Sequence, residues 1–425
     1  MTQFFRIVEH TINCAHTREY VTATANGDAD RPRLAVKQYI PLDNPNPQPG
    51  DVTIIAAHAN GFPKELYEPL WDDLQKRSSE TGIRIRSIWI ADMWNQGQSG
   101  VLNEKILGND PSWWDHTRDL ANLINLKRDE MPQPLVGIGH SMGGAQLTYL
   151  ALCHPRLLHS LALLDPVITT SHSGIGPAAA STNRRDIWDS RAAAAARFAK
   201  SPFYRAWDPR VLDLWVRHGL RALPTELYPS PPGAAGTSST TTTTDPTDPP
   251  VTLTTTKHQE LFTFLRPTYL PNRDLRDFDP SLLGLGPSQE QRGKSPAYAF
   301  YRPEPLHAFA RLPELRPGVL YVFGETSEMS SAAERRAKME RTGCGVGGSG
   351  GVEKGRVKEV VLDCGHLVAM ERVGGCAEAV GGFLKGELGR WRGEWERERE
   401  GRVGVQRGEV VMVDERWKRE IKGKI

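Results

Sequence analysis

The sequence of 425 residues is poor in cysteine, in long apolar runs and in net charge. Its five cysteines are an odd number, and none lies in a C-x-x-C pair or beside histidine at zinc-ligand spacing, so we expect reduced thiols and no metal site. No run approaches the ~20 apolar residues that cross a bilayer, which excludes a transmembrane anchor. The first residues lack the basic and apolar segments of a secretory leader, so we expect an intracellular protein.

Charge singles out no partner. Lys and Arg number 53 and Asp and Glu number 51, so the formal net charge is +2. This balance produces no long-range field that would attract nucleic acid or an anionic membrane. The charge-rich stretch 387–402 alternates acidic with basic residues, which is typical of a solvated surface helix. We therefore expect no nucleic-acid partner.

The apolar pattern predicts alternating strands and helices. Strands 4–12 and 34–40 read as an opening antiparallel hairpin. Nearly continuous apolar runs, typical of strands buried on both faces, follow at 51–57, 83–90, 135–138 and 160–164. Helices are expected between them, for example over 113–128 after a cap at Asp110 or Ser112. Repeated β-α-β units predict a mostly parallel, doubly wound sheet with helices on both faces.

The alternation stops after residue 165 and resumes with strands 318–323 and 357–362. We therefore expect one core in two parts, 1–165 and 318–390, an inserted and largely helical cap over 166–317, and a charged C-terminal extension over 391–425. The cap has helical stretches at 184–200, 209–218 and 257–265, and a low-complexity loop at 230–250 without fixed structure. The Gly-rich stretch 343–355 predicts a flexible connection.

A serine stands between a predicted strand and a predicted helix. Ser141 lies in Gly139-His140-Ser141-Met142-Gly143, after the apolar strand 135–138. G-x-S-x-G is the nucleophile elbow of the α/β-hydrolase fold, in which small neighbours permit a strained turn that exposes the serine. In a Gly-rich chain this motif alone can occur by chance, so it is weak evidence for a nucleophile. Its position between a predicted strand and a predicted helix makes the evidence stronger. We predict Ser141 as nucleophile, with the amide of Met142 as one oxyanion donor.

A second oxyanion donor is expected after the buried strand 51–57. The loop there reads His58-Ala59-Asn60-Gly61-Phe62, and the amide of Asn60 is the candidate. We interpret His58 as bracing this loop and His140 as structural, because His140 faces away from the nucleophile.

The general base is predicted late in the chain, at His366 in Asp363-Cys364-Gly365-His366, directly after the last strand. The acid that orients it is left open by the residues. Ser327 stands after strand 318–323, where an aspartate is customary. We favour Asp165, at the end of the strand that follows the nucleophile helix, with Glu325 as the alternative acid and Glu328 third.

These motifs resemble a known group. The run His58-Ala59-Asn60-Gly61-Phe62-Pro63-Lys64-Glu65-Leu66-Tyr67-Glu68-Pro69-Leu70, together with Gly139-His140-Ser141-Met142-Gly143-Gly144 and Gly365-His366-Leu367-Val368, resembles fungal α/β-hydrolases related to yeast peroxisomal lipase and to AK-toxin-type biosynthesis hydrolases. The resemblance implies an acyl or carboxylic-ester hydrolase for a lipid-like or polyketide-like substrate, with the acid after the nucleophile helix. The Thr-rich insert departs from this group, so the shape of the cap is not carried over.

We therefore predict a serine hydrolase that cleaves a carboxylic ester through an acyl-serine intermediate, without a cofactor. The alternatives are an acyl thioesterase and a non-hydrolytic ligand-binding protein that keeps the fold. Its partner would be a small apolar or acyl substrate, and cap aromatics would line the pocket or form the cap core (Trp188, Phe198, Phe203, Tyr204, Trp207, Trp215). The chain ends Gly423-Lys424-Ile425, a degenerate peroxisomal signal, so we expect a peroxisomal import receptor as partner, with the cytoplasm as the alternative location.

Overall fold

The computed structural model describes residues 2–171, 174–229, 247–267 and 300–422. Most of the predicted low-complexity loop 230–250 and the tripeptide Gly423-Lys424-Ile425 lie outside the described residues. Within the described residues, no helix is both long enough and apolar enough to cross a membrane.

Eight strands of the described chain form one sheet in the order β1-β2-β4-β3-β5-β6-β12-β13. The pairs β1·β2 and β2·β4 are antiparallel, and every later pair is parallel. This confirms the predicted opening hairpin and mostly parallel sheet. The bounds are β1 (Phe5–Asn13), β2 (Arg33–Pro41), β3 (Val52–Ala57), β4 (Ile85–Ala91), β5 (Leu135–His140), β6 (Ser160–Leu164), β12 (Gly318–Gly324) and β13 (Val357–Leu362).

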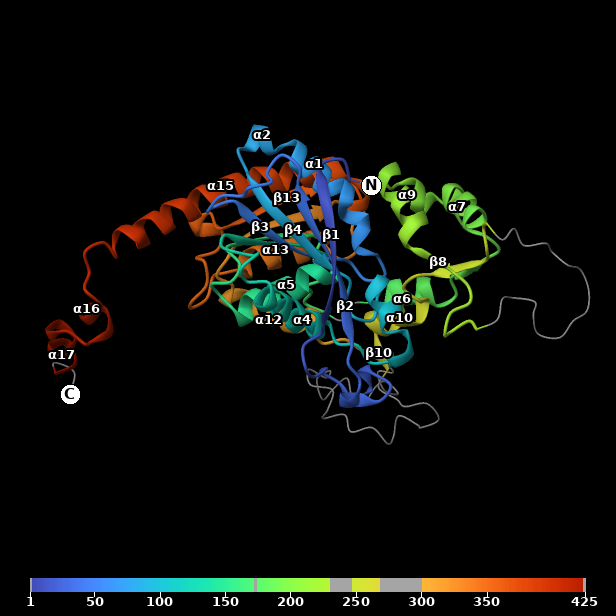
Figure 1. Cartoon of the computed structure of the whole chain (residues 1–425), viewed down its shortest axis with the longest axis horizontal. Helices are drawn as coiled ribbons and strands as arrows, with labels where there is room; N and C mark the ends of the chain where they lie inside the picture. Colours follow the sequence, from blue (N-terminus) through green and yellow to red (C-terminus); the bar gives the residue numbers. More distant parts are fainter. Residues whose placement is uncertain (1, 172–173, 230–246, 268–299, 423–425) are drawn as a thin grey trace, which may run out of the picture.

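Side chains of the central strands alternate between two hydrophobic cores, one on each face of the sheet. Ile54 and Val136 belong to one core, and their neighbours Ile55 and Leu135 belong to the other. Figure 1 shows α1 and α15 over one face and α4, α5 and α12 over the other. Because both faces are covered, these strands read as continuous apolar runs in the sequence.

Helix α4, expected over 113–128, begins where the pattern predicts and ends two residues earlier, at Leu126. Ser112 caps α4 through a capping box with Asp115. The bounds are α1 (Glu68–Lys76), α2 (Ser78–Thr81), α3 (Gly97–Leu102), α4 (Trp113–Leu126), α5 (Met142–Cys153), α12 (Glu304–Arg311), α13 (Ala332–Arg341), α14 (Val368–Glu371) and α15 (Val373–Glu400).

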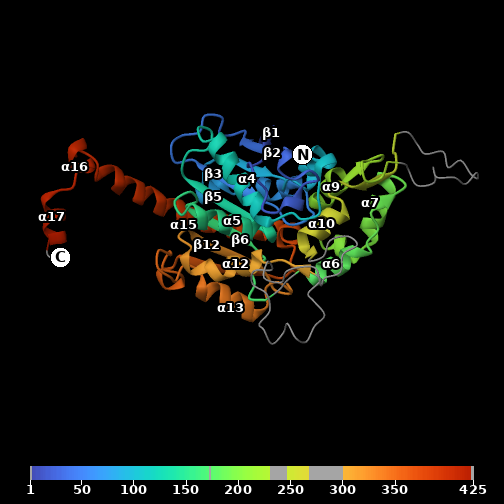
Figure 2. The same ribbon diagram turned by 90° about the horizontal axis from the view of Figure 1, so that it is seen from below.

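The described part of the segment between β6 and β12 lies mostly at one end of the sheet, as Figures 1 and 2 show, although α12 at its end packs against α5 over one face. It contains α6 (Ile175–Thr182), α7 (Arg191–Lys200), α8 (Pro202–Arg205), α9 (Pro209–His218) and α10 (Lys257–Phe264). It also contains a small sheet that the sequence pattern did not predict, in the order β7-β9-β8, and a strand pair β10·β11. Their bounds are β7 (Ile187–Trp188), β8 (Leu220–Ala222), β9 (Val251–Leu253), β10 (Arg266–Pro267) and β11 (Phe300–Tyr301). The division of the chain at 166 and 317 stays a prediction.

Two local predictions are wrong. The helix expected over 184–200 begins at Arg191, because Ile187 and Trp188 pair with β9 and the side chain of Ser190 caps α7. The Gly-rich stretch 343–355 is held by main-chain hydrogen bonds, such as those from Gly343 to Leu312 and from Gly345 to Pro313. A Cβ on Gly343, Gly345 or Gly348 would lie 2.8 Å or less from a neighbouring atom, so these three glycines allow close packing, whereas a Cβ on Gly347 or Gly355 would meet nothing within 4 Å.

The predicted charged surface helix is the outer half of α15. In Figure 1, α15 continues beyond the body of the protein and leads to α16 (Arg407–Val411) and α17 (Glu415–Lys422). The residues of α16 and α17 are exposed throughout.

Candidate active site

The loop between β5 and α5 carries Ser141 in a strained conformation. Its backbone has φ 56° and ψ −118°. Among the described residues, Ser141 and Asp165 are the non-glycine residues with positive φ. Such strain costs of order 1–3 kcal/mol and persists where the surroundings enforce it, often at functional sites.

Glycines on either side of Ser141 let the surrounding chain approach closely. A Cβ on Gly143 would lie 2.3 Å from the carbonyl oxygen of Ala57 in β3, and one on Gly139 would lie 2.6 Å from the carbonyl oxygen of Gly143. Any larger residue would push α5 away from the sheet. The local geometry is the elbow that the G-x-S-x-G pattern predicts.

Three of the predicted residues form one hydrogen-bonded chain. His366 Nε2 lies 2.8 Å from Ser141 Oγ, and His366 Nδ1 lies 2.6 Å from Asp165 Oδ2. Asp165 follows β6 and is fully buried, whereas Ser141 and His366 border a cavity. Because a carboxylate can only accept, His366 Nδ1 carries the proton and Nε2 is free to accept the serine hydroxyl hydrogen.

Asp165 is ionised despite its burial. Desolvation raises its pKa, but hydrogen bonds from His366 and Ser327, together with the positive charge of the imidazole when it is protonated, outweigh that effect, so the pKa of Asp165 lies below its ordinary value. The amide of Gly324 also donates to Asp165 Oδ1, at 3.4 Å. A charged acceptor is therefore present where the imidazole needs one.

The structure brings Asp165, and not the alternative acids, to His366. Glu325 and Glu328 are exposed, and neither hydrogen-bonds to His366. Ser327, at the customary acid position, instead donates its hydroxyl to Asp165 Oδ2 at 2.5 Å. Ser327, which occupies the customary position of the acid, is therefore a hydrogen-bond donor to Asp165 at the end of the neighbouring strand.

The amide of Asn60 is flanked by two amides that are already engaged. Ala59 N–H donates to Tyr67 Oη and Gly61 N–H donates to Gln96 Oε1, both at 2.8 Å. Within the described part of the chain, the N–H of Asn60 has no acceptor. Met142 opens α5, where the first N–H groups lack a partner inside the helix. Both residues line the cavity beside Ser141.

His58 and His140 are both buried and fully hydrogen-bonded. His58 Nε2 accepts from Met93 N–H, so its Nδ1–H donates to the carbonyl of Ala59. His140 Nδ1 accepts from Tyr67 Oη–H at 2.9 Å, and its Nε2–H donates to the carbonyl of His366 at 3.2 Å. Burial lowers the pKa of His140 to about 3, so it is neutral. These contacts agree with the structural interpretation of both residues.

The cavity at Ser141 has a volume of about 640 Å³ and mostly apolar walls. The six aromatics that we predicted for the pocket or the cap core divide into two groups. Phe203, Tyr204 and Trp215 line the cavity, whereas Trp188, Phe198 and Trp207 are buried in the hydrophobic core that also covers one face of the sheet. One polar patch interrupts the apolar wall. Glu260 of α10 accepts from Ser181 Oγ at 2.7 Å and from Arg184 Nη2 at 2.5 Å.

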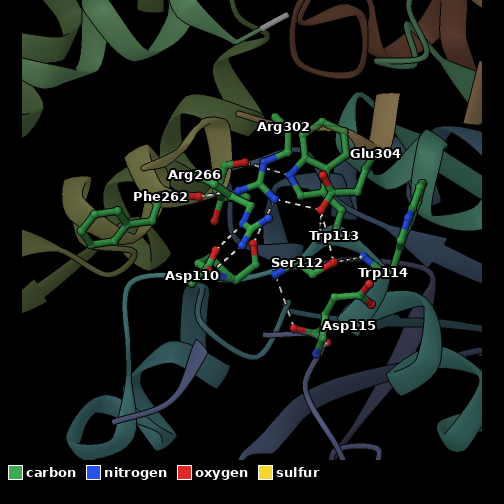
Figure 3. Close-up of polar contacts among 12 residues, drawn as sticks. Asp110, Ser112, Trp113, Trp114, Asp115, Phe262, Arg266, Arg302 and Glu304 are labelled. Atoms are coloured by element: carbon green, nitrogen blue, oxygen red, sulfur yellow. Dashed lines mark hydrogen bonds and ion pairs between the residues drawn. The ribbon is translucent and has the colours of Figure 1, made fainter. Parts of the chain in front are cut away.

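Helix α10, which forms this wall, is fixed to the core by the polar cluster in Figure 3. Arg302 donates to the carbonyl of Phe262 in α10 at 2.6 Å, and also to Glu304 and to the carbonyl of Pro111. Glu304 accepts from the amide of Trp113, whose indole N–H donates to the carbonyl of Thr263. The cavity wall therefore has a defined position over the sheet.

Removal of the Ser327 hydroxyl tests whether its hydrogen bond stabilises the ionised form of Asp165. We expect Ser327→Ala to lower the free energy of unfolding by about 1–3 kcal/mol at pH 7, because a buried charged acceptor loses a donor. The pKa of Asp165 in the folded state lies below its unfolded value of about 3.9, so its stabilising contribution is present above that value and is lost as the pH falls through the folded-state pKa. The difference from wild type should therefore shrink below about pH 4 in urea unfolding experiments.

Thr326→Ala is the matched control, since Thr326 Oγ1 donates to the carbonyl of Cys364 and not to Asp165. Its effect on stability should not change with pH over this range. A Ser327→Ala difference that stayed constant from pH 3 to pH 8 would contradict the assignment.

Comparison with known proteins agrees with this geometry. Residues 54–379 match the model of the alpha/beta hydrolase family. The chain is 41% identical over 436 aligned residues to a protein named Type I acyl-CoA thioesterase mpaH' of Penicillium brevicompactum, covering 99% of this chain and 96% of that protein. It is 27% identical over 259 residues to abhydrolase domain-containing protein AFT2-1 of Alternaria alternata, covering 60% of this chain and 84% of that protein.

Among solved structures, the fold is similar to the peroxisomal alpha-beta-hydrolase Lpx1 of Saccharomyces cerevisiae, with a TM-score of 0.64 and 15% identity over 100% of this chain and 97% of that one. The expected resemblance to fungal hydrolases and the expected fold are thus confirmed. The family model covers well over half of the sequence, and the chain belongs to the alpha/beta hydrolase family.

Proposed function

We propose that this hydrolase cleaves an acyl thioester of coenzyme A through an acyl-Ser141 intermediate. The observation that carries the proposal is the hydrogen-bonded chain Ser141–His366–Asp165 at the wall of an apolar cavity. A serine hydroxyl is a weak nucleophile until a base accepts its proton, and His366 Nε2 is the acceptor within reach.

In the proposed reaction, His366 takes the proton of Ser141 as Oγ attacks the thioester carbonyl carbon. The amides of Asn60 and Met142 stabilise the resulting oxyanion, and Asp165 stabilises the imidazolium. The C–S bond then breaks, and the thiolate leaves with the proton from His366. Water, deprotonated by His366, then attacks the acyl carbonyl carbon. The bond from that carbon to Ser141 Oγ breaks, Oγ regains the proton from His366, and the carboxylic acid leaves.

We propose a thioester substrate in place of the carboxylic ester that we predicted from the sequence alone. Attack on either substrate uses the same groups, so the geometry does not separate them. The preference is supported by the 41% identity, over almost the whole chain, to a protein named as an acyl-CoA thioesterase. The apolar walls near Ser141 suit a hydrocarbon-rich acyl group.

A panel of substrates tests the reaction class. We expect CoA thioesters of medium and long acyl chains to be hydrolysed with kcat/KM at least about tenfold above that of p-nitrophenyl esters of the same acids, measured by thiol release and by absorbance. Ser141→Ala should lower kcat by at least about 1000-fold and abolish labelling by a fluorophosphonate probe.

Each other outcome has a defined meaning. Faster turnover of the esters would make the protein an esterase and overturn the thioester assignment. Absence of both turnover and labelling in the wild type would favour a ligand-binding protein that has kept the fold.

Two isosteric substitutions test the acid. Asp165→Asn should lower kcat about 1000- to 10,000-fold, because the imidazole loses the partner that fixes its tautomer. Glu325→Gln, in the loop after β12, should leave kcat within about twofold of wild type, since the exposed Glu325 is not a hydrogen-bond partner of His366. Loss of turnover in Glu325→Gln with near-normal turnover in Asp165→Asn would reverse the assignment.

We also propose that the protein is imported into peroxisomes through its C-terminal tripeptide. Support comes from the small-basic-apolar sequence Gly423-Lys424-Ile425. An N-terminal fluorescent fusion should give peroxisomal puncta, and deletion of residues 423–425 should make the signal diffuse. Diffuse fluorescence of the full-length fusion would favour the cytoplasmic alternative.

A further inference from the structure

Gln96 lies behind the loop that carries Asn60 and is fully buried. Its side-chain amide uses its hydrogen-bonding groups on two sides. Oε1 accepts from Gly61 N–H at 2.8 Å, while Nε2 donates to Asn60 Oδ1 at 2.7 Å and to Thr263 Oγ1 at 3.1 Å. If the oxygen and nitrogen of the Gln96 amide exchanged places, Nε2 would face the donor Gly61 N–H and Oε1 would face the acceptor Asn60 Oδ1. The network therefore fixes the orientation of this amide.

The same loop is held from the opposite side by the cap. Asn60 Nδ2 donates to the carbonyl of Glu260 in α10 at 3.0 Å. Gly61 has φ 85° and packs closely against Glu260. A Cβ added to Gly61 would lie 2.8 Å from Glu260 Oε2. The Asn60 amide is therefore located between contacts to Gln96 and contacts to α10.

A fixed position matters for an oxyanion donor. The loop 58–62 belongs to no helix or strand of the structure. Its main chain forms a turn in which Phe62 N–H donates to the carbonyl of Ala59 at 3.2 Å, but this bond does not engage the Asn60 N–H itself. Donors stabilise an oxyanion efficiently when they are oriented before the charge develops. Gln96 supplies this orientation through bonds to Asn60 and to the residue after it.

We propose that Gln96 is a positioning residue that fixes the Asn60 amide for oxyanion stabilisation and couples that amide to the cap through Thr263. This rests on the proposed function, because it assumes that an oxyanion forms at Ser141. Gln96 contacts no reacting atom, so its loss should affect the transition state and leave binding of the substrate ground state intact.

The test compares Gln96→Leu with Asn95→Leu. Asn95 Nδ2 donates to Gln259 Oε1 and Thr263 Oγ1 of the same helix, at 3.0 and 3.1 Å, but Asn95 has no bond to the loop 58–62. We expect Gln96→Leu to lower kcat about 10- to 100-fold with KM within twofold, in line with loss of one oriented donor. Asn95→Leu should keep kcat within about threefold. The assay uses whichever thioester or ester the wild type hydrolyses.

An alkyl trifluoromethyl ketone, whose adduct with Ser141 carries an oxyanion, gives a second readout. Its inhibition constant should rise in Gln96→Leu by the same factor as kcat falls, whereas that of an S-alkyl-CoA thioether, which has no carbonyl, should not change. The pH midpoint of kcat/KM should also stay at the wild-type value, because the contacts of His366 and Asp165 are untouched.

Asn60→Ala keeps the main-chain N–H and removes the side chain that Gln96 holds. Its loss of kcat should be less than additive with that of Gln96→Leu, since both act through one amide. It also keeps the proposal testable if Gln96→Leu fails to fold.

Equal losses in Gln96→Leu and Asn95→Leu, an unchanged ketone affinity, or a loss confined to KM would each overturn the role of Gln96. Failure of the proposed function would appear differently, as a wild-type protein without turnover or labelling.

Discussion

Two main-chain hydrogen bonds join the turn at Ser141 to the end of β6, and the arrangement of the candidate site depends on them. Ser141 N–H donates to the carbonyl of Leu164 at 2.9 Å, and Val167 N–H donates to the carbonyl of Ser141 at 3.1 Å. Asp165 lies between these two partners. The contacts that hold Ser141 in its strained conformation therefore also fix the position of Asp165. His366, from the loop after β13, hydrogen-bonds to both residues. Ser141 and Asp165, the two non-glycine residues with positive φ in the described chain, share one set of contacts, which explains how the strain persists.

Much of this arrangement could be predicted from the sequence, because it depends on local signals. Apolar runs gave the buried strands, and the G-x-S-x-G turn placed Ser141 at the carboxyl end of β5. The acid stayed ambiguous for a physical reason. β6 and β12 are neighbours in the sheet, so residues after either strand end beside the same histidine. The sequence cannot say which side chain turns inward, and here Ser327 of the second strand end donates to Asp165 of the first.

Other features had no local signal. Gln96 is a single glutamine in a loop, and its side chain contacts residues 35, 36 and 167 positions away, so neither periodicity nor a motif could identify it. The small sheet β7-β9-β8 joins strands of two and three residues, too short to show alternation. Gly-rich composition suggested flexibility at 343–355, although glycine serves equally where two stretches of main chain approach each other.

The polar patch in the cavity wall is formed by Glu260, Ser181 and Arg184, and Glu260 lies on α10, the helix that also contacts the Asn60 loop. Glu260 supplies the main-chain carbonyl that holds Asn60, and its side chain lies against Gly61, next to the proposed oxyanion donor. An unpaired carboxylate there would oppose the negative charge that develops on the substrate, and more strongly in an apolar cavity than in water. Arg184 and Ser181 compensate that charge by direct hydrogen bonds. The apolar wall of the cavity and the electrostatics beside the proposed oxyanion donor Asn60 therefore depend on the same helix, α10.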